Sequence, residues 1–178
     1  MRSLCDLRRF AAVLGVAVLI ASCRDTGGEG EYYRLDGKLF VFNYRVATAT
    51  YLVNIAPVKP PADGEVAVAR FEDPAGGAPI VVREKIWPRL VRTTIQSPPL
   101  RCVAKGRPYA VTIRIEDATG AVKQTIETTM TSSEDQDILP DRPLVVGPLY
   151  QPNPELAGHP DGQLPGADEA PCPPRAQG

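Results

Sequence analysis

The residues best suited to covalent chemistry in this chain of 178 residues are its four cysteines. A thiol can form a disulfide, bind a metal ion or carry a covalent modification. Cys23 has the most distinctive setting, because it directly follows an apolar stretch over 10–21 and small side chains. Arg2, Arg8 and Arg9 precede that stretch, so residues 1–22 have the charged start and apolar middle of an export signal. The stretch is shorter than the roughly 20 residues that a membrane-spanning helix needs.

The tetrapeptide Ile20-Ala21-Ser22-Cys23 resembles the lipobox of bacterial lipoproteins. The resemblance implies that residues 1–22 are a signal peptide that is removed. It also implies that Cys23 carries a thioether-linked diacylglycerol, with a further acyl chain such as palmitate on its new amino group. Two alternatives stay open, an ordinary secretory signal before a chance cysteine and export by the twin-arginine route through Arg8-Arg9-Phe10.

The same resemblance implies a place in the bacterial envelope, with the protein attached to a membrane by its N-terminal lipid. Arg24 stands where an aspartate favours retention at the inner membrane of enteric bacteria. We therefore expect the outer membrane, with the protein facing the periplasm. The small and acidic side chains of residues 23–35 predict a flexible tether between the lipid and a folded domain.

Two cysteines, Cys102 and Cys172, remain as thiols once Cys5 leaves with the signal and Cys23 takes the lipid. An oxidising compartment favours a disulfide between them. Such a bridge would close a loop of about 70 residues and contribute roughly 4 kcal/mol by constraining the unfolded chain. Two unpaired thiols are the alternative. A metal site is disfavoured, because neither cysteine has a second Cys or His at ligand spacing.

Residues 36–146 have the alternation and the turn residues of an all-β domain. The clearest strand is 109–116, where apolar and polar side chains alternate, and a turn leads to a second strand over 122–131. We expect the apolar side chains of that second strand to share one face, namely Val122, Ile126 and Met130. Short strands between regular turns predict an immunoglobulin-like antiparallel β-sandwich, with a small β-barrel as the alternative. Trp87 is expected to fill its core, with a ligand-stacking role as the alternative.

Residues 147–178 are rich in proline and glycine and poor in large apolar groups. They predict a tail that is extended or disordered, except where Cys172 holds it. His159, the single histidine, lies in this tail, where nothing positions it as a base. No sequence pattern of a nucleophilic serine or of a phosphate loop is present. We therefore expect no catalytic residues, no cofactor, no metal ion and no enzyme activity.

The acidic residues over 134–141 lack the glycine and the distant glutamate of an EF-hand loop. A solvated turn is therefore favoured there over a weak calcium site. Basic residues gather between 83 and 107, and alternate residues of a strand share a face, so Arg83 and Lys85 would point to the same side.

A basic face formed by Arg83, Lys85, Arg89 and Arg92 would suit anionic lipid, lipopolysaccharide or an acidic partner. Neutralisation by the chain's own acidic strands is the alternative. The formal net charge of −1 gives no indication of a nucleic-acid partner.

Three segments, 60–73, 97–100 and 109–115, consist of a proline-led strand that ends in an acid, a proline break and an alternating strand. Together they resemble the small β-sandwich lipoproteins related to type III secretion pilotins. The resemblance implies a binding or assembly factor for outer-membrane secretion rings and carries over no catalytic residues. The chain departs from that group in its proline-rich tail and in Cys102 and Cys172.

The leading hypothesis is thus a membrane-anchored, non-enzymatic protein-binding or assembly module with a partner in the envelope. A structural lipoprotein that binds anionic glycan or lipid through the basic face is the second hypothesis. An unrecognised hydrolase is the third.

Overall fold

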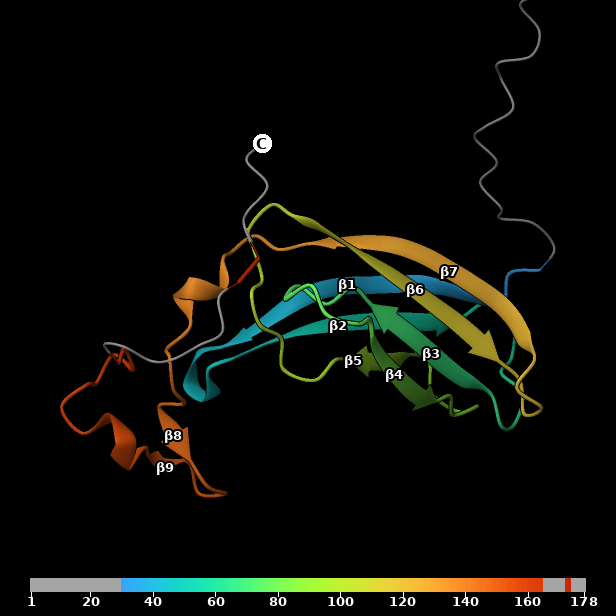
Figure 1. Cartoon of the computed structure of the whole chain (residues 1–178). Coiled ribbons are helices and arrows are strands. Elements are labelled where there is room, and N and C mark those ends of the chain that lie inside the picture. The colour runs from blue at the N-terminus through green and yellow to red at the C-terminus, as the bar shows by residue number, and fades with distance from the viewer. Residues whose placement is uncertain (1–29, 165–171, 174–178) are drawn as a thin grey trace, which may run out of the picture. The chain divides into compact units, whose positions relative to one another are not determined.

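The computed structural model describes residues 30–164 and 172–173. From Glu31 onward the described residues form one compact unit, in which seven strands make two antiparallel sheets (Figure 1). The first sheet has the order β1-β2-β5, with β1 at Tyr33–Asn43, β2 at Thr48–Pro57 and β5 at Thr93–Gln96. The second has the order β4-β3-β6-β7, with β3 at Val66–Phe71, β4 at Ile80–Lys85, β6 at Pro108–Glu116 and β7 at Val122–Thr131. The predicted all-β sandwich is confirmed, and the two sheets are not closed into a barrel.

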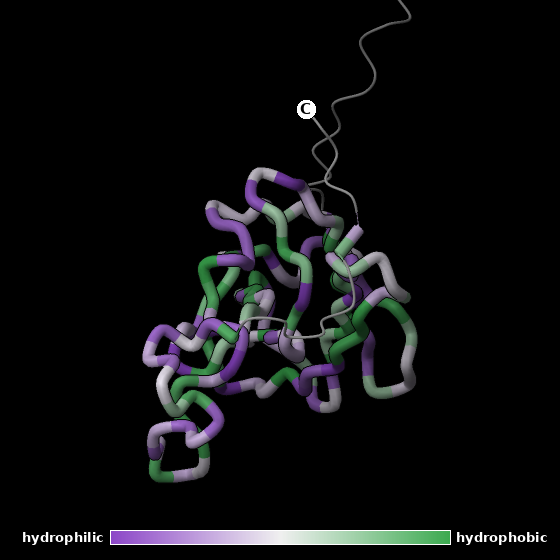
Figure 2. The backbone as a smooth tube through the Cα atoms, turned by 60° about the vertical axis from the view of Figure 1, so that its left-hand side comes forward, coloured by the Kyte–Doolittle hydropathy of each residue, from purple (hydrophilic) through white to green (hydrophobic). Residues whose placement is uncertain are grey.

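The core forms where alternate residues of both sheets face each other. Tyr51, Val53 and Ile55 of β2 are fully buried, as are Tyr109 and Ile113 of β6. The residues that alternate with them, Leu52 and Asn54 of β2 and Ala110 and Thr112 of β6, are more exposed. Hydrophobic and hydrophilic residues are accordingly mixed along the folded chain (Figure 2). This alternation is what a strand with one buried face requires.

An aromatic cluster joins the two sheets at the centre of the core. Tyr51 of β2 stacks on Phe71 of β3 with 5.0 Å between the ring centroids, and Phe40 of β1 lies 5.7 Å from Tyr109 of β6. Aromatic pairs at such distances add stabilisation beyond the apolar area that they bury. These rings fill the place for which the sequence suggested Trp87.

The strand directions divide the loops between two ends of the sandwich. Because neighbouring strands are antiparallel, the start of β1, the β2–β3 loop, the β4–β5 loop and the β6–β7 turn lie at one end, which we call the entry end. Two backbone hydrogen bonds join these segments, from Val58 N to Tyr32 O at 2.8 Å and from Ile86 N to Glu65 O at 3.0 Å. The opposite end, which we call the far end, holds the η1 turn at Tyr44–Val46. With 11 residues in β1, the two ends are on the order of 35 Å apart.

The entry end is closed by a buried carboxylate. Glu65 is 1% exposed, and its oxygens accept hydrogen bonds from the Tyr33 hydroxyl at 2.5 Å and from the Lys123 ammonium. Burial alone would raise the pKa of Glu65, but the hydrogen bonds from Lys123 and Tyr33 lower it below the ordinary value of 4.5. Gln124 accepts hydrogen bonds from the Tyr32 and Tyr33 amides at 2.8 Å. The start of β1 is thereby attached to β7.

The chain after the sandwich is ordered further than the sequence suggested. It forms η2 at Gln136–Ile138, the short pair β8 at Val145–Val146 and β9 at Gln151–Pro152, and η3 at Pro154–Leu156. The predicted boundary between 146 and 147 thus falls inside a hairpin, and the sandwich strands already end at Thr131. At the other boundary, β1 begins at Tyr33, within the segment predicted to be tether.

The expectation of an extended or disordered tail is wrong for residues 147–164. The Asn153 side chain donates to Pro143 O at 2.8 Å and accepts from Glu155 N at 3.0 Å, while Leu156 is buried. The amide side chain of Asn153 therefore satisfies two backbone groups that would otherwise form hydrogen bonds with water. Residues 165–171 and 174–178 lie outside the described residues.

Candidate functional site

The predicted lipidation site, Cys23, and the rest of residues 1–29 lie outside the described residues. Lipidation of Cys23 therefore stays a prediction. Along the described parts of the chain, no helix is long and apolar enough to cross a membrane.

The predicted disulfide between Cys102 and Cys172 is confirmed. The two residues are 70 positions apart in the chain and 5.4 Å apart between their Cα atoms. Beside the bridge, Pro173 lies against Gly76 of the β3–β4 turn, where an added methyl group would stand 3.5 Å from the proline ring. Gly76 has a φ of +80°, so a residue with a side chain would also be strained there. The disulfide thus fixes residues 172–173 to the far end of the sandwich.

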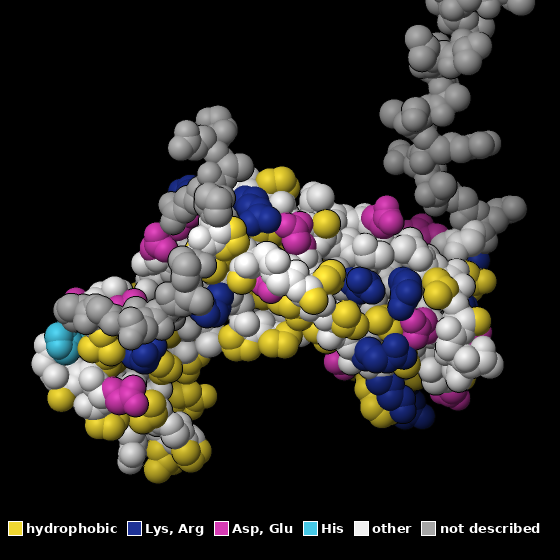
Figure 3. All heavy atoms as spheres, in the orientation of Figure 1, with side chains coloured by type: hydrophobic (Ala, Val, Ile, Leu, Met, Phe, Trp, Pro, Cys, Tyr) yellow, Lys and Arg dark blue, Asp and Glu magenta, His cyan; other side chains and the backbone are white. Residues whose placement is uncertain are grey.

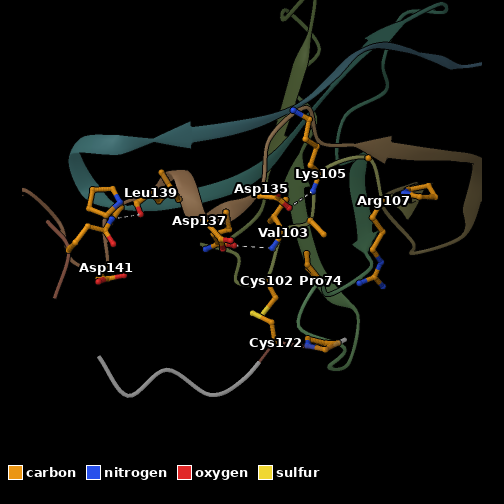
Figure 4. A pocket seen from close by; sticks show the side chains of 18 residues that line it. Pro74, Cys102, Val103, Lys105, Arg107, Asp135, Asp137, Leu139, Asp141 and Cys172 are labelled. Carbon is orange, nitrogen blue, oxygen red and sulfur yellow. Dashed lines mark hydrogen bonds between the residues drawn. A yellow bond between two sulfur atoms is a disulfide. The ribbon is translucent and has the colours of Figure 1, made fainter. Parts of the chain in front are cut away.

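A hollow of about 1220 Å³ lies beside this disulfide, between the 102–108 segment, the η2 region and residues 163 and 172–173 (Figure 4). Most of its polar groups hold the surrounding loops together. Val103 N donates to the Gln136 side chain at 3.0 Å, and Lys105 N donates to Asp135 at 2.9 Å. Arg107 pairs with Glu72 at 2.6 Å. These contacts assign the described lining a structural role.

The acidic segment over 134–141 contributes to this hollow through Asp135, Asp137 and Asp141. The carboxylate of Asp141 accepts a hydrogen bond from Leu164 N at 2.7 Å. Within residues 30–164 and 172–173, no group of three or more His, Cys, Asp or Glu side chains could hold a metal ion.

Two of the four predicted basic residues share a face. Arg83 and Lys85 stand opposite Val68 and Val66 of β3, on the outer face of the four-stranded sheet. Arg83 forms an ion pair with Glu116 at 2.9 Å. Glu116 is largely buried and also pairs with Arg114 at 3.3 Å, so one carboxylate joins two guanidinium groups. Arg83 is therefore neutralised by an acid of the chain itself, as the alternative proposed.

The other two predicted basic residues lie elsewhere. Arg92 forms an ion pair with Asp36 of β1 at 2.6 Å, so its side chain is bound to the three-stranded sheet and not to β4. Arg89 is exposed in the β4–β5 loop. Neither Arg89 nor Lys85 forms an ion pair with a carboxylate of the described chain. The binding role of these four residues stays a prediction.

The β4–β5 loop, residues 86–92, is the exposed feature that sequence reasoning missed, and we call it the Trp87 loop. The prediction that Trp87 is a core residue is wrong, because 52% of its surface is exposed. Leu90 and Val91 are exposed by 50% and 87%. The Lys85 ammonium lies 4.0 Å from the centroid of the Trp87 ring. Figure 3 shows Lys and Arg side chains together with hydrophobic ones at the lower right, where Figure 1 places β4.

The Trp87 loop is held at both of its ends. Ile86 is buried, and its amide bonds to Glu65 O. Inside the loop, Leu90 N donates to Trp87 O at 3.0 Å, and Arg92 is fixed by Asp36. The exposed apolar side chains are therefore presented by a supported backbone. A signal for this was present in the sequence, since the loop consists of apolar and basic residues and contains no acid.

A second exposed apolar feature is the β8–β9 tip, which we define as residues 146–150. Leu149 is 79% exposed and Tyr150 is 60% exposed. The Arg45 guanidinium lies 5.4 Å from the centroid of the Tyr150 ring, and Leu144 N donates to Arg45 O at 2.9 Å. These contacts attach the hairpin to η1, at the far end of the sandwich. Hydrophobic side chains gather at the lower left of Figure 3, where Figure 1 places β8 and β9.

The chain matches no protein-family model and no curated protein.

Proposed function

We propose that the protein is a non-enzymatic lipoprotein of the bacterial envelope, anchored through lipid on Cys23, whose sandwich binds a protein partner or assists its assembly. The observation that carries this proposal is the β8–β9 tip. It presents Leu149 and Tyr150 to solvent on a hairpin that Asn153 and Arg45 hold in place.

A hairpin with this construction suits protein recognition for two reasons. Aromatic and aliphatic side chains form the anchors of protein interfaces, and tyrosine is enriched there. A segment that is already ordered also loses less conformational entropy when it binds. The tip belongs to the far end of the sandwich, on the order of 35 Å from the entry end, where the chain leads in from Cys23.

The disulfide supports the proposed compartment. A bridge between Cys102 and Cys172 forms and persists in an oxidising environment such as the periplasm. Because the chain resembles pilotin-related lipoproteins, an outer-membrane secretion ring is the first partner to test.

The proposal is tested by site-specific photocrosslinking in intact envelopes. A photoreactive residue in place of Leu149 should give one discrete adduct of higher mass. The matched control places the same residue at Leu39, an exposed apolar position in β1, and should give none. The proposal would be contradicted if the residue at position 149 gave no adduct, or if positions 149 and 39 gave the same set of adducts.

Binding of an anionic glycan or lipid is the second candidate function, and the outer face of β4 favours it. Arg83 and Lys85 share that face with Arg70 and Arg114, against the carboxylates of Glu116 and Glu127. Binding of this kind should weaken with salt, because screening reduces the attraction between exposed charges. Reversal of the charges at Arg83 and Lys85 should abolish it.

A further inference from the structure

We infer that the Trp87 loop docks the domain on the anionic surface of a lipid bilayer, as a second membrane contact beside the lipid on Cys23. The inference deepens the proposed function and rests on it for the presence of a membrane beside the domain. It concerns the loop alone and does not involve the β8–β9 tip.

The composition of the loop matches a membrane interface. Trp87, Leu90 and Val91 expose apolar surface, while Lys85 and Arg89 add positive charge without a paired acid among residues 30–164 and 172–173. Tryptophan concentrates at the level of lipid headgroups, and each Lys or Arg near an anionic surface contributes about 1 kcal/mol of attraction. The positive charge and the apolar surface of the loop therefore both favour an anionic lipid bilayer.

The loop is built so that its apolar side chains cannot retreat into the core. The space between the sheets is filled by the rings of Phe40, Tyr51, Phe71 and Tyr109. Ile86 takes the buried position at the start of the loop, and the pair of Arg92 with Asp36 fixes its end. Trp87 and its apolar neighbours thus stay exposed until another surface covers them.

The position of the loop also fits a membrane contact. The loop lies at the entry end, where Ile86 N bonds to Glu65 O and Glu65 in turn accepts from Lys123. Lys123 and Lys59 both place their ammonium groups near the ring of Tyr32, at 4.2 and 4.7 Å from its centroid. The segment that leads in from Cys23 thus joins the domain at the end that carries the Trp87 loop.

The neighbours of Trp87 favour lipid over glycan. A stacked sugar needs several hydrogen-bonding side chains beside the aromatic ring. Of the exposed residues between Trp87 and Arg92, only Arg89 is polar, and Pro88, Leu90 and Val91 are apolar. Lys85 already lies over the ring of Trp87. Acyl chains and anionic headgroups satisfy the apolar and the basic side chains together.

The chain contains a single tryptophan, which makes Trp87 a built-in probe. The full chain is reconstituted in vesicles of phosphatidylcholine, with or without phosphatidylglycerol. In the anionic vesicles we expect Trp87 emission to move to shorter wavelength. Quenching by brominated lipid should rise and quenching by aqueous acrylamide should fall.

Matched variants test the individual side chains. Arg89→Gln removes one cation and should lower the ratio of docked to undocked domain about five-fold, from about 1 kcal/mol for each charge. Val91→Ser should lower it further, because an apolar group is lost from the contact. Leu149→Ser at the far end, a similarly exposed position, should leave it unchanged.

Three results would overturn the inference: equal acrylamide quenching of Trp87 in both kinds of vesicle, no effect of Arg89→Gln, or protection of Trp87 only after an envelope protein is added. The Cys23→Ser chain separates this failure from failure of the proposed function. Lipid-dependent quenching of Trp87 in that chain supports the loop without the anchor. Acylated Cys23 with an exposed Trp87 supports the anchor without the loop.

Discussion

At the scale of single residues, Glu65 is the most informative side chain of the domain. Its carboxylate is charged inside the entry end because Lys123 and Tyr33 both donate to it. A buried ion pair of this kind gives little net stability compared with an apolar replacement. The loss of one partner is nevertheless destabilising, because it leaves the other charge buried and unpaired. The pair therefore constrains which substitutions the entry end tolerates.

Lys123→Met should lower the free energy of unfolding by roughly 3 to 5 kcal/mol, because it leaves Glu65 buried without its cation. Urea denaturation followed by circular dichroism measures the change. Lys105→Met is the matched control, since Lys105 is exposed and its ammonium group forms only a 4.0 Å ion pair with Glu134. That variant should change stability by less than about 0.5 kcal/mol. Equal effects of the two variants would refute a special role of the buried pair.

Acid should destabilise the domain through Glu65. The pKa of Glu65 is lower in the folded than in the unfolded chain, where it takes its ordinary value of about 4.5. The folded state therefore binds fewer protons. The contribution of Glu65 to stability is complete above its pKa in the unfolded chain. It is lost as the pH falls through the pKa of Glu65 in the folded chain.

Urea midpoints measured from neutral pH down to about pH 3 should show this loss, and Glu65→Gln should reduce it. The dependence that remains in the variant is expected from Asp117, whose pKa is lowered by hydrogen bonds from Thr119 and Ala121. A wild-type midpoint that rises with acid would contradict the assigned charge of Glu65.

Residue-level expectations succeeded where chemistry alone decides. The pairing of Cys102 with Cys172 followed from the number of thiols and the expected compartment. The burial of Trp87 could not be judged from the sequence, because it depends on which aromatic residues meet between the sheets. Tyr51, Phe71 and Tyr109 occupy that space, and Trp87 lies outside it.

At the scale of elements, the β6–β7 hairpin shows what alternation predicts and where it fails. Both strands formed as expected, and Ile126 and Met130 face inward as predicted. Val122 does not share their face. The register shifts between Ile115 and Glu116, so that Val122 stands opposite Glu116 and is half exposed. A bulge re-aims side chains in this way, and alternation within one strand gives no sign of it.

The C-terminal extension was mispredicted for a different reason. Composition correctly indicated few large apolar groups but not the local hydrogen bonds of Asn153. Such contacts depend on the partner segment, here Pro143, which lies ten residues earlier in the chain. Low apolar content is therefore compatible with an ordered hairpin when one polar side chain satisfies several backbone groups.

Removal of the disulfide should destabilise the domain by roughly 4 kcal/mol, because the bridge closes a loop of about 70 residues in the unfolded chain. Urea denaturation of Cys102→Ser, Cys172→Ser and the double variant measures the loss. All three should be destabilised alike. A loss below about 1 kcal/mol would mean that the bridge adds little to the stability of the sandwich.

At the scale of the whole domain, the strand directions assign different surfaces to the two ends. The entry end combines the start of β1, the Glu65 network and the Trp87 loop. The far end combines the disulfide and the β8–β9 tip. The sandwich thus separates the proposed membrane contact from the proposed protein contact. Sequence reasoning predicted the sandwich and the basic residues of the Trp87 loop. It did not predict which apolar side chains stay exposed, because that depends on how distant segments of the chain pack.

The central claim is that this domain is held at a membrane through Cys23. The most direct measurement is mass spectrometry of the N-terminal peptide from protein isolated out of bacterial membranes. Lipidation requires that the mature chain begins at Cys23 and carries the mass of a diacylglycerol and an acyl chain. A mature chain that begins elsewhere, or an unmodified Cys23 thiol, would contradict it.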